Sequence, residues 1–156
     1  MGVLGIGVDI LRVPRIAALV QRKSALRLAS RILSQPELSV WNNMVNKDAD
    51  TRLRFLAVRY VIWSDARRRA SLTRGPTLSH RWSVKEAAYK ALYPHARPTW
   101  KELTFLDGPS HINGKKPVLR YLPEHSATPS VLLHASISHD GDYVFATVLA
   151  ETSLND

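Results

Sequence analysis

Four side chains in this sequence have types and spacings that could act together on a phosphate group. Asp9 follows the glycine-rich stretch VLGIGV, Glu86 and Lys90 belong to WSVKEAAYKAL, and His139 belongs to SISHDGDY. Residues four apart share one face of a helix, so Glu86 and Lys90 should lie side by side. Two carboxylates are a typical protein contribution to Mg²⁺ when phosphate oxygens supply other ligands. Lys85 and Lys90, which flank Glu86, would then hold the phosphates.

Each of these residues alone has a commoner explanation. A glutamate and a lysine four residues apart are usually a surface salt bridge that contributes little stability. Asp9 could cap a turn or a helix, and His139 could belong to a hairpin. The functional interpretation therefore depends on the four residues meeting in the fold.

The composition favours one basic globular domain. The chain has 156 residues, a formal net charge of +9, and no cysteine. A charge this high suggests a polyanionic partner, such as nucleic acid, an anionic membrane surface, a phosphorylated small molecule or an acidic protein, although a basic protein without such a partner is the alternative. The lack of cysteine excludes disulfides and thiolate metal sites and fits a reducing compartment. No apolar run approaches the ~20 residues that span a bilayer.

The order of predicted elements indicates an α+β fold. Residues 3–10 read as a buried strand, and Pro14 fits the first turn of a basic helix. Ser34 could cap the next helix. A helix over residues 82–92 is stopped by Pro94. Strands follow, with Asn113-Gly114 and Asp140-Gly141 as turn signals.

Five stretches resemble a known family when they are taken in order. These are GIGVDILRVPRI, ASRILSQPEL, WSVKEAAYKAL, NGKKP and SISHDGDYVFATVLAE. Together they are similar to the holo-acyl-carrier-protein synthases, the small bacterial-type branch of the 4'-phosphopantetheinyl transferases, and a fungal member of that branch is one interpretation. The resemblance covers nearly the whole chain except residues 60–81.

The resemblance implies a reaction and a catalytic set. The enzyme would move phosphopantetheine from coenzyme A to a serine of an acyl carrier protein and release adenosine 3',5'-bisphosphate. Asp9 and Glu86 match the family's Mg²⁺ ligands, and Lys90 matches the lysine near the coenzyme's pyrophosphate. The base for the serine hydroxyl stays open between Glu86 and a metal-bound water held by Asp9.

The resemblance also implies binding residues and an assembly. His139, Arg81 and Lys115 would contact coenzyme A, with Arg81 standing in for Arg59. Arg15 would help to dock the carrier protein or the nucleotide. Carrier proteins of this family are strongly acidic, so the net positive charge would steer them in. Family members of this size are homotrimers, so we expect a homotrimer of the phosphopantetheinyl transferase fold, with an antiparallel sheet packed on helices.

Residues 60–81 interrupt what is one continuous helix in the family. Removing them would join RFLAVR directly to WSVKEAAYKAL. The amino acids of this segment and its borders can be encoded by codons that contain a splice donor, a branch site and a splice acceptor. Its 22 residues correspond to 22 × 3 = 66 nucleotides, so removing them would keep the reading frame. We interpret residues 1–156 as one domain carrying an atypical insertion, either a retained intron or a lineage-specific loop. We expect two helices joined by a mobile loop, with Ser79 or Ser83 capping the second one.

Two rival functions remain on the sequence alone. One is a basic nucleic-acid-binding module that uses ARRRASLTRG, although its arginines lack interleaved aromatic residues and nucleic acid is therefore a disfavoured partner. The other is a relative inactivated by the insertion. We expect no membrane partner and a cytoplasmic location, with the mitochondrial matrix as the alternative.

Overall fold

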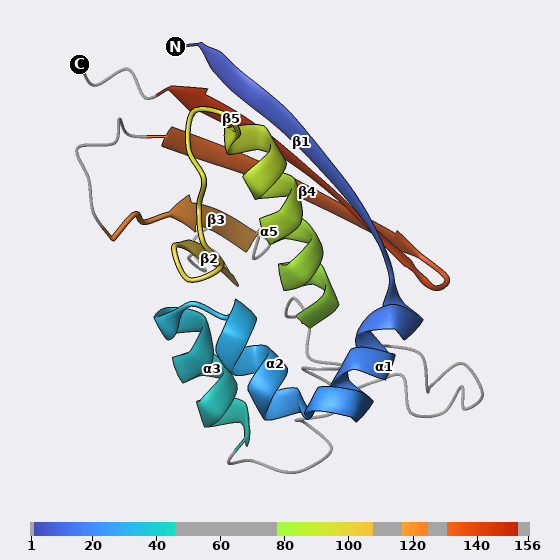
Figure 1. Ribbon diagram of the computed structural model, residues 1–156. Coiled ribbons are helices and arrows are strands. Elements are labelled where there is room, and N and C mark those ends of the chain that lie inside the picture. Colours follow the sequence, from blue (N-terminus) through green and yellow to red (C-terminus); the bar gives the residue numbers. More distant parts are fainter. Residues whose placement is uncertain (1, 46–77, 108–116, 125–130, 153–156) are drawn as a thin grey trace.

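The structure, a computed structural model, describes residues 2–45, 78–107, 117–124 and 131–152. Helices pack against an antiparallel sheet, which confirms the predicted α+β class (Figure 1). No helix in these ranges is long and apolar enough to cross a membrane. The elements are β1 (Val3–Arg12), α1 (Val13–Lys23), α2 (Ala25–Ile32), α3 (Gln35–Val45), α5 (Leu78–Leu92), β2 (Leu103–Asp107), β3 (Pro117–Tyr121), β4 (Val131–Asp140) and β5 (Tyr143–Thr152).

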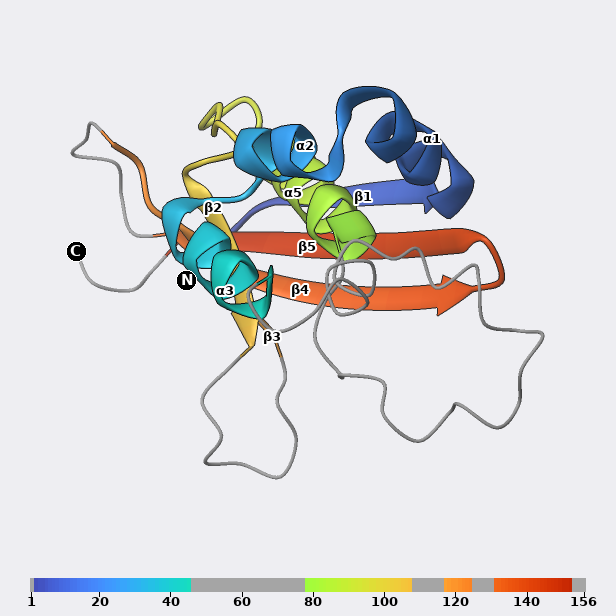
Figure 2. The ribbon, with the colours of Figure 1, turned by 90° about the horizontal axis from the view of Figure 1, so that it is seen from below.

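The main sheet has three antiparallel strands in the order β1–β5–β4, which Figure 2 shows side by side. The turn between β4 and β5 contains Gly141 at φ 49°, as the Asp140-Gly141 signal predicted. Strands β2 and β3 form a second antiparallel pair beside β4. The other turn signal, Asn113-Gly114, lies outside the described residues.

One face of the main sheet is covered by α5, and its other face is open. Along β1, the side chains of Ile6, Val8 and Ile10 alternate outward and are 43–65% exposed, whereas Leu11 points inward and is buried. On α5, the alanines and Val84 that face the sheet are fully buried. This period-2 burial is what a strand with one covered face requires.

Helices α1, α2 and α3 gather near the end of α5 that begins at Leu78 (Figure 1). Pro14 lies in the first turn of α1, as predicted. The basic stretch predicted as one helix is broken at Ser24, which has a positive φ of 63° and separates α1 from α2. Helix α3 begins directly after Ser34, where the sequence placed its start.

The structure corrects the predicted start of the helix that carries Glu86. The helix begins at Leu78, four residues before the family motif, so neither Ser79 nor Ser83 is its N-cap. Leu78, Ser79 and Arg81 are buried. The last four residues of the predicted insertion are therefore part of the packed domain, whereas residues 60–77 and the upstream FLAVR stretch lie outside the described residues.

Candidate functional site

Helix α5 approaches β1 so closely that only glycine fits between their backbones. A Cβ atom at Gly7 would overlap the carbonyl oxygen of Ala87 and lie 2.6 Å from the amide nitrogen of Ala91. A Cβ atom at Gly5 would overlap the carbonyl oxygen of Ala91. Glycine in a strand permits this close backbone approach. As a result, Asp9, two residues beyond Gly7 on the same face of β1, lies against α5.

The carboxylate of Asp9 is held by two side chains of α5. The Ser83 hydroxyl donates a hydrogen bond of 2.9 Å to one oxygen, and the Lys90 ammonium lies 3.1 Å from the other. Lys90 also donates to the carbonyl of Val8 at 2.8 Å. Glu86 lies between these two contacts along the helix, three residues after Ser83 and four before Lys90, so all three occupy one helix face.

Charge interactions link Glu86 to this group. Its partial burial raises its carboxyl pKa above the ordinary value, and the negative charge of Asp9 raises the pKa further. The positive charges of Lys90 and Arg15 act in the opposite direction. A cation bound between Asp9 and Glu86 would relieve the repulsion between the two carboxylates.

The donor set fits Mg²⁺. Asp9 uses two of the roughly four acceptor positions of a carboxylate for Ser83 and Lys90, which leaves positions for a metal ion. The described residues contain no cluster of three or more histidine, aspartate or glutamate side chains that could hold a metal. A site with two carboxylates suits Mg²⁺, because this ion usually keeps several waters and takes other ligands from substrate phosphates.

The raised pKa of Glu86 implies that stability depends on pH. The pKa of Glu86 is higher in the folded protein than in the unfolded chain, so the folded protein binds more protons at pH values between the two. The stabilising contribution of Glu86 is therefore lost as pH rises through its folded pKa. Without metal, Glu86→Gln is therefore expected to raise the melting temperature at pH 7, with the gain shrinking toward pH 4. Thermal melts in chelator would measure this, with exposed Glu124→Gln as the control. A Glu86→Gln protein that melts lower than the parent at pH 7 would contradict the explanation.

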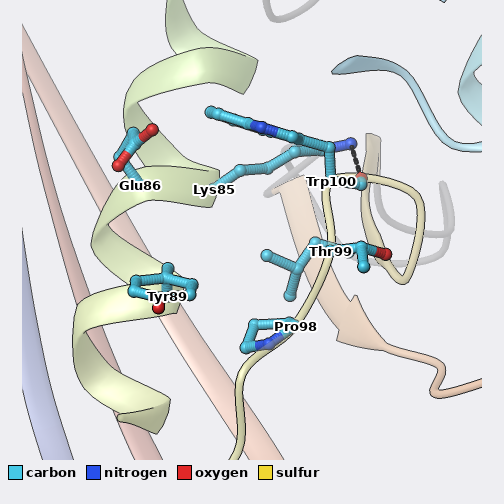
Figure 3. Close-up of a pocket in the computed structure, with 7 residues that line it drawn as sticks. Lys85, Glu86, Tyr89, Pro98, Thr99 and Trp100 are labelled. Atoms are coloured by element: carbon cyan, nitrogen blue, oxygen red, sulfur yellow. Dashed lines mark hydrogen bonds between the residues drawn. The ribbon is translucent and has the colours of Figure 1, made fainter. Parts of the chain in front are cut away.

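A pocket of about 220 Å³ opens beside Glu86. Glu86 and Tyr89 of α5 lie on one side, and the turn that carries Pro98, Thr99 and Trp100 lies on the other (Figure 3). The lining is mostly carbon, from the aromatic rings and the proline. The pocket therefore places an apolar slot next to the charged group on α5.

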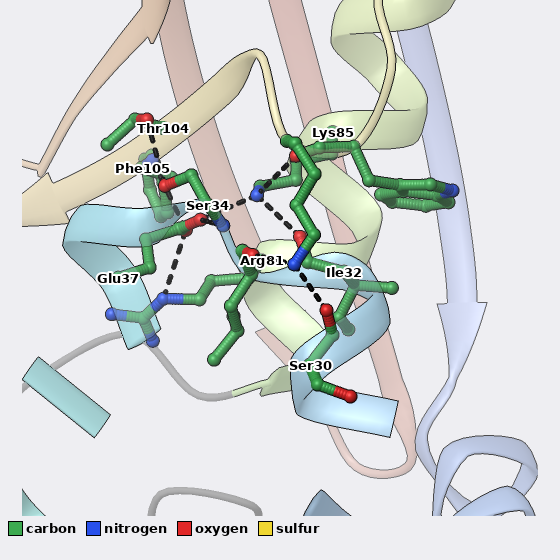
Figure 4. Close-up of polar contacts among 11 residues, drawn as sticks. Ser30, Ile32, Ser34, Glu37, Arg81, Lys85, Thr104 and Phe105 are labelled. Carbon is green, nitrogen blue, oxygen red and sulfur yellow. Dashed lines mark hydrogen bonds and ion pairs between the residues drawn. The ribbon is translucent and has the colours of Figure 1, made fainter. Parts of the chain in front are cut away.

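Behind this pocket, a buried polar cluster joins α5 to α3 (Figure 4). The carboxylate of Glu37 is fully buried and accepts from the Lys85 ammonium at 2.6 Å and from the Ser34 and Phe105 amides at 2.8 and 3.2 Å. The Arg81 guanidinium lies 3.3 Å from its other oxygen. Burial lowers the pKa of Lys85 to about 8, against the opposing effect of Glu37. The buried carboxylate of Glu37 is tolerated here because both of its oxygens have hydrogen-bond donors or a cation beside them.

This cluster corrects one expectation and constrains another. Lys85 is 1% exposed and its ammonium points into the core, so the expectation that it holds a phosphate is wrong. Arg81 is 2% exposed and lies against Glu37. A contact between Arg81 and the coenzyme stays a prediction, and the structure directs the Arg81 guanidinium to the interior.

The other predicted residues fall in different places. Arg15 is exposed on α1, and it lies near enough to Glu86 for its positive charge to lower the pKa of the Glu86 carboxyl. His139 lies at the end of β4, where its ring centroid is 5.7 Å from that of His80 on the first turn of α5. The structure thus brings Asp9, Glu86, Lys90 and Arg15 together and places His139 nearer the start of α5. Lys115 lies outside the described residues.

Sequence reasoning missed three residues of the site. Ser83 could have been found, since it lies three residues before Glu86 on the helix face already assigned to chemistry. Tyr89 and Trp100 had no such signal, because their role depends on how the turn before β2 packs against α5.

Known proteins resemble this chain over nearly its whole length. Residues 5–148 match the family model described as the 4'-phosphopantetheinyl transferase superfamily. A relative from Paraburkholderia phytofirmans, named holo-acyl-carrier-protein synthase, is 31% identical over 157 residues and aligns with 98% of this chain and 94% of its own length.

Two solved structures show the same fold. The holo-acyl-carrier-protein synthase of Neisseria meningitidis has a TM-score of 0.60 at 23% identity and covers 97% of this chain and 100% of its own. The synthase of Bacillus anthracis, solved in complex with CoA (3',5'-ADP), has a TM-score of 0.56 at 21% identity and covers 97% and 98%. The chain therefore belongs to the 4'-phosphopantetheinyl transferase superfamily, in the branch of the holo-acyl-carrier-protein synthases.

Proposed function

We propose that the protein transfers the 4'-phosphopantetheine group of coenzyme A to a serine of an acyl carrier protein. The serine oxygen forms a bond to the phosphorus of the phosphopantetheine, and the bond from that phosphorus to the bridging pyrophosphate oxygen breaks. Adenosine 3',5'-bisphosphate leaves. The observation that carries the proposal is the contact of Asp9 with both Ser83 and Lys90, which bracket Glu86 on α5. Membership of the superfamily supplies the reaction class.

In this proposal, Asp9 and Glu86 would hold Mg²⁺, which would also bind the pyrophosphate of coenzyme A. When bound, the ion neutralises charge on the phosphate under attack and on the leaving group. Lys90 is half exposed, with 49% of its side chain accessible, so its ammonium can turn from Asp9 toward a phosphate oxygen. The proton of the serine hydroxyl needs an acceptor, and either Glu86 or a metal-bound water held by Asp9 would serve.

The carrier protein would bind along α1 and α2. Residues 11–36 contain no acidic residue, and their six basic side chains are all exposed: Arg12, Arg15, Arg22, Lys23, Arg27 and Arg31. A second pocket of about 400 Å³ lies within this surface, lined by three of these cations and by the Trp82 and Trp100 rings. Exposed basic residues of this density attract an acidic partner and orient it before contact.

We extend the proposal to a homotrimer built on the open face of the main sheet. Ile6, Val8 and Ile10 of β1 are exposed there, beside Phe145 of β5, which pairs with Ile10. Contiguous apolar side chains on an open sheet face usually mark an interface.

Ile10→Lys is therefore expected to convert a trimer into monomers, because a charge would be buried at the contact. Size-exclusion chromatography with light scattering measures this directly. Val118→Lys, which changes an exposed apolar residue on β3, is the matched control and should stay trimeric. A parent protein that is monomeric at micromolar concentration would contradict the assembly.

The function is tested by incubating the protein with coenzyme A, Mg²⁺ and an apo acyl carrier protein and measuring the carrier's mass. We expect the mass to increase by one phosphopantetheine group, only with Mg²⁺ and only when the acceptor serine is present. An unchanged mass under conditions where a known synthase labels the same carrier would overturn the proposal. Labelling should also slow as salt is added, since screening weakens the basic surface.

We keep residues 60–81 as an insertion in a single domain, and transcript reads across this segment would identify a retained intron. The cytoplasm is the proposed location, with the mitochondrial matrix as the alternative, and cell fractionation decides between them.

A further inference from the structure

The two side chains that hold Asp9 differ in how well they are shielded from solvent. The Asp9 side chain is only 16% exposed, so its carboxylate depends on donors that the protein supplies. Ser83 donates to one oxygen at 2.9 Å, and Lys90 donates to the other at 3.1 Å. Ser83 is fully buried, whereas 49% of the Lys90 side chain is exposed. The contact with Ser83 is therefore protected, and the contact with Lys90 can open.

The two donors also differ in charge. The Lys90 ammonium cancels part of the negative charge of Asp9, and in the proposed reaction it turns toward a phosphate oxygen. The Ser83 hydroxyl is neutral, so it orients the carboxylate without reducing the charge that attracts a cation. When Lys90 turns away, Ser83 is the one of these two donors that still fixes Asp9.

The Ser83 hydroxyl is fully used by this contact. A serine inside a helix can donate back to the carbonyl four residues earlier, which belongs to Ser79 here. The hydroxyl carries a single hydrogen, and the bond to Asp9 uses it. Ser79, one turn earlier on α5, is also buried, and its own hydroxyl has no hydrogen-bond partner among the described residues. Of these two buried serines, Ser83 is thus the one that joins α5 to β1.

The same hydrogen bond fixes Asp9 relative to Glu86. Ser83 lies three residues before Glu86, so both side chains project from one face of α5. Asp9 is therefore tied to the helix that carries the second carboxylate, one turn away from it. The close approach of α5 to Gly7 sets the distance between helix and strand, and the Ser83 bond sets how the carboxylate between them is turned.

The orientation of a carboxylate affects which metal ion it prefers. Mg²⁺ demands near-ideal octahedral geometry with short bonds, whereas Ca²⁺ accepts more ligands, longer bonds and carboxylates that bind through both oxygens. A carboxylate held by a donor cannot easily turn both oxygens toward one ion, and this restriction suits Mg²⁺. A carboxylate that is free to rotate can present both oxygens, which suits Ca²⁺.

We propose that Ser83 is a positioning residue for the proposed metal site, where its hydroxyl holds the Asp9 carboxylate in the orientation that favours Mg²⁺ over Ca²⁺. The inference rests on the proposed function and deepens it, because it assigns metal selectivity to a residue that does not touch the ion. Ser83 acts through Asp9 and takes no part in the transfer of the phosphopantetheine group.

The test measures metal binding without turnover. Mn²⁺ is bound to the protein in the presence of coenzyme A and the absence of a carrier protein, and Mg²⁺ or Ca²⁺ is then added to displace it. The electron paramagnetic resonance signal of free Mn²⁺ reports each displacement, and a protein-free titration corrects for ions bound by the coenzyme alone.

Ser83→Ala removes the hydroxyl and leaves a strong helix former at this position of α5. We expect this variant to bind Mg²⁺ roughly 10–100-fold more weakly, the usual effect of losing a hydrogen bond to a metal ligand. Binding of Ca²⁺ should weaken less, so the preference for Mg²⁺ over Ca²⁺ should fall about tenfold. In transfer assays, the Mg²⁺ concentration that gives half the maximal rate should rise, whereas kcat at saturating Mg²⁺ should change little.

Two further variants separate this role from a general effect on folding. Ser79→Ala is the matched control, because it removes a buried hydroxyl from the same helix without removing a hydrogen bond to any described residue. It should keep the parent affinities for both ions. Ser83→Thr retains a hydroxyl and should keep the preference for Mg²⁺.

Parental affinities for both ions in Ser83→Ala would overturn the inference. Equal weakening of both ions would overturn it as well, because a merely loosened structure would cause that result, and so would a parent protein without a preference for Mg²⁺. If Ser83→Ala does not fold, Ser83→Thr decides: a retained preference supports the inference and a lost preference overturns it. A parent protein that binds Mg²⁺ selectively but labels no carrier would instead overturn the proposed function and leave the role of Ser83 in metal binding standing.

Discussion

Glu86→Gln is expected to lower the rate of phosphopantetheine transfer by about 10²–10⁴-fold while leaving the protein folded. The carboxylate provides one of two proposed Mg²⁺ ligands, and loss of several kcal/mol of charge stabilisation in the transition state has an effect of this size. The change is nearly isosteric and removes the repulsion with Asp9, so the fold should not suffer. The measurement is the initial rate of carrier labelling at saturating coenzyme A.

Asp9→Asn should cause a loss of similar size, and combining it with Glu86→Gln should add little. Residues that serve one ion act as a unit, so their effects are not additive. Glu124→Gln, on the surface after β3, is the control and should keep the parent rate. Rates in Glu86→Gln within a few fold of the parent would show that Glu86 is neither ligand nor base.

Gly7→Ala is expected to cause the largest loss of stability among single-methyl changes in the described residues of β1. The added Cβ would overlap the Ala87 carbonyl oxygen, and both groups are backbone or attached directly to it, so no side-chain rotation relieves the clash. Either α5 moves away from the sheet or β1 loses its register with β5. Overpacking in a tight core costs about 1–3 kcal/mol, and more where backbone must move.

The same change should also reduce transfer in the protein that remains folded, because Asp9 and α5 would separate. Chemical unfolding measures the first effect, and the labelling rate measures the second. Gly2→Ala is the control, since a Cβ there meets only the Thr152 hydroxyl at 3.7 Å. A Gly7→Ala protein with parental stability and rate would contradict the close approach of helix and strand.

The sequence predicted the elements that depend on local pattern. The strand at residues 3–10, the Pro14 signal, the Ser34 signal and the Asp140-Gly141 turn each depend on short-range chemistry, and the structure confirms these elements. The prediction that the strand is buried is wrong for one face, where Ile6, Val8 and Ile10 are exposed. Glu86 and Lys90 could be placed on one helix face for the same reason. The pairing of this face with Asp9 came from the family resemblance, because no local rule connects positions so far apart.

What the sequence did not predict depends on packing between distant segments. Lys85 precedes Glu86 directly and Lys90 follows it by four residues. The Lys85 side chain points into the core, whereas the Lys90 side chain points toward Asp9. Helix periodicity places Lys85 on a different face from Glu86 and Lys90, but only the packing of α3 against α5 decides that the Lys85 ammonium is buried. The start of α5 at Leu78 was missed for a related reason, since burial of Leu78 and Arg81 extends the helix beyond the family motif.

The most direct test of the account is a titration of the protein with Mn²⁺ as a paramagnetic substitute for Mg²⁺, monitored by the loss of the free-ion electron paramagnetic resonance signal. We predict one site per chain in the parent protein when coenzyme A is present, and loss of that site in Asp9→Asn and in Glu86→Gln alike. Retention of the site with parental affinity in either variant would show that the two carboxylates do not share one metal ion.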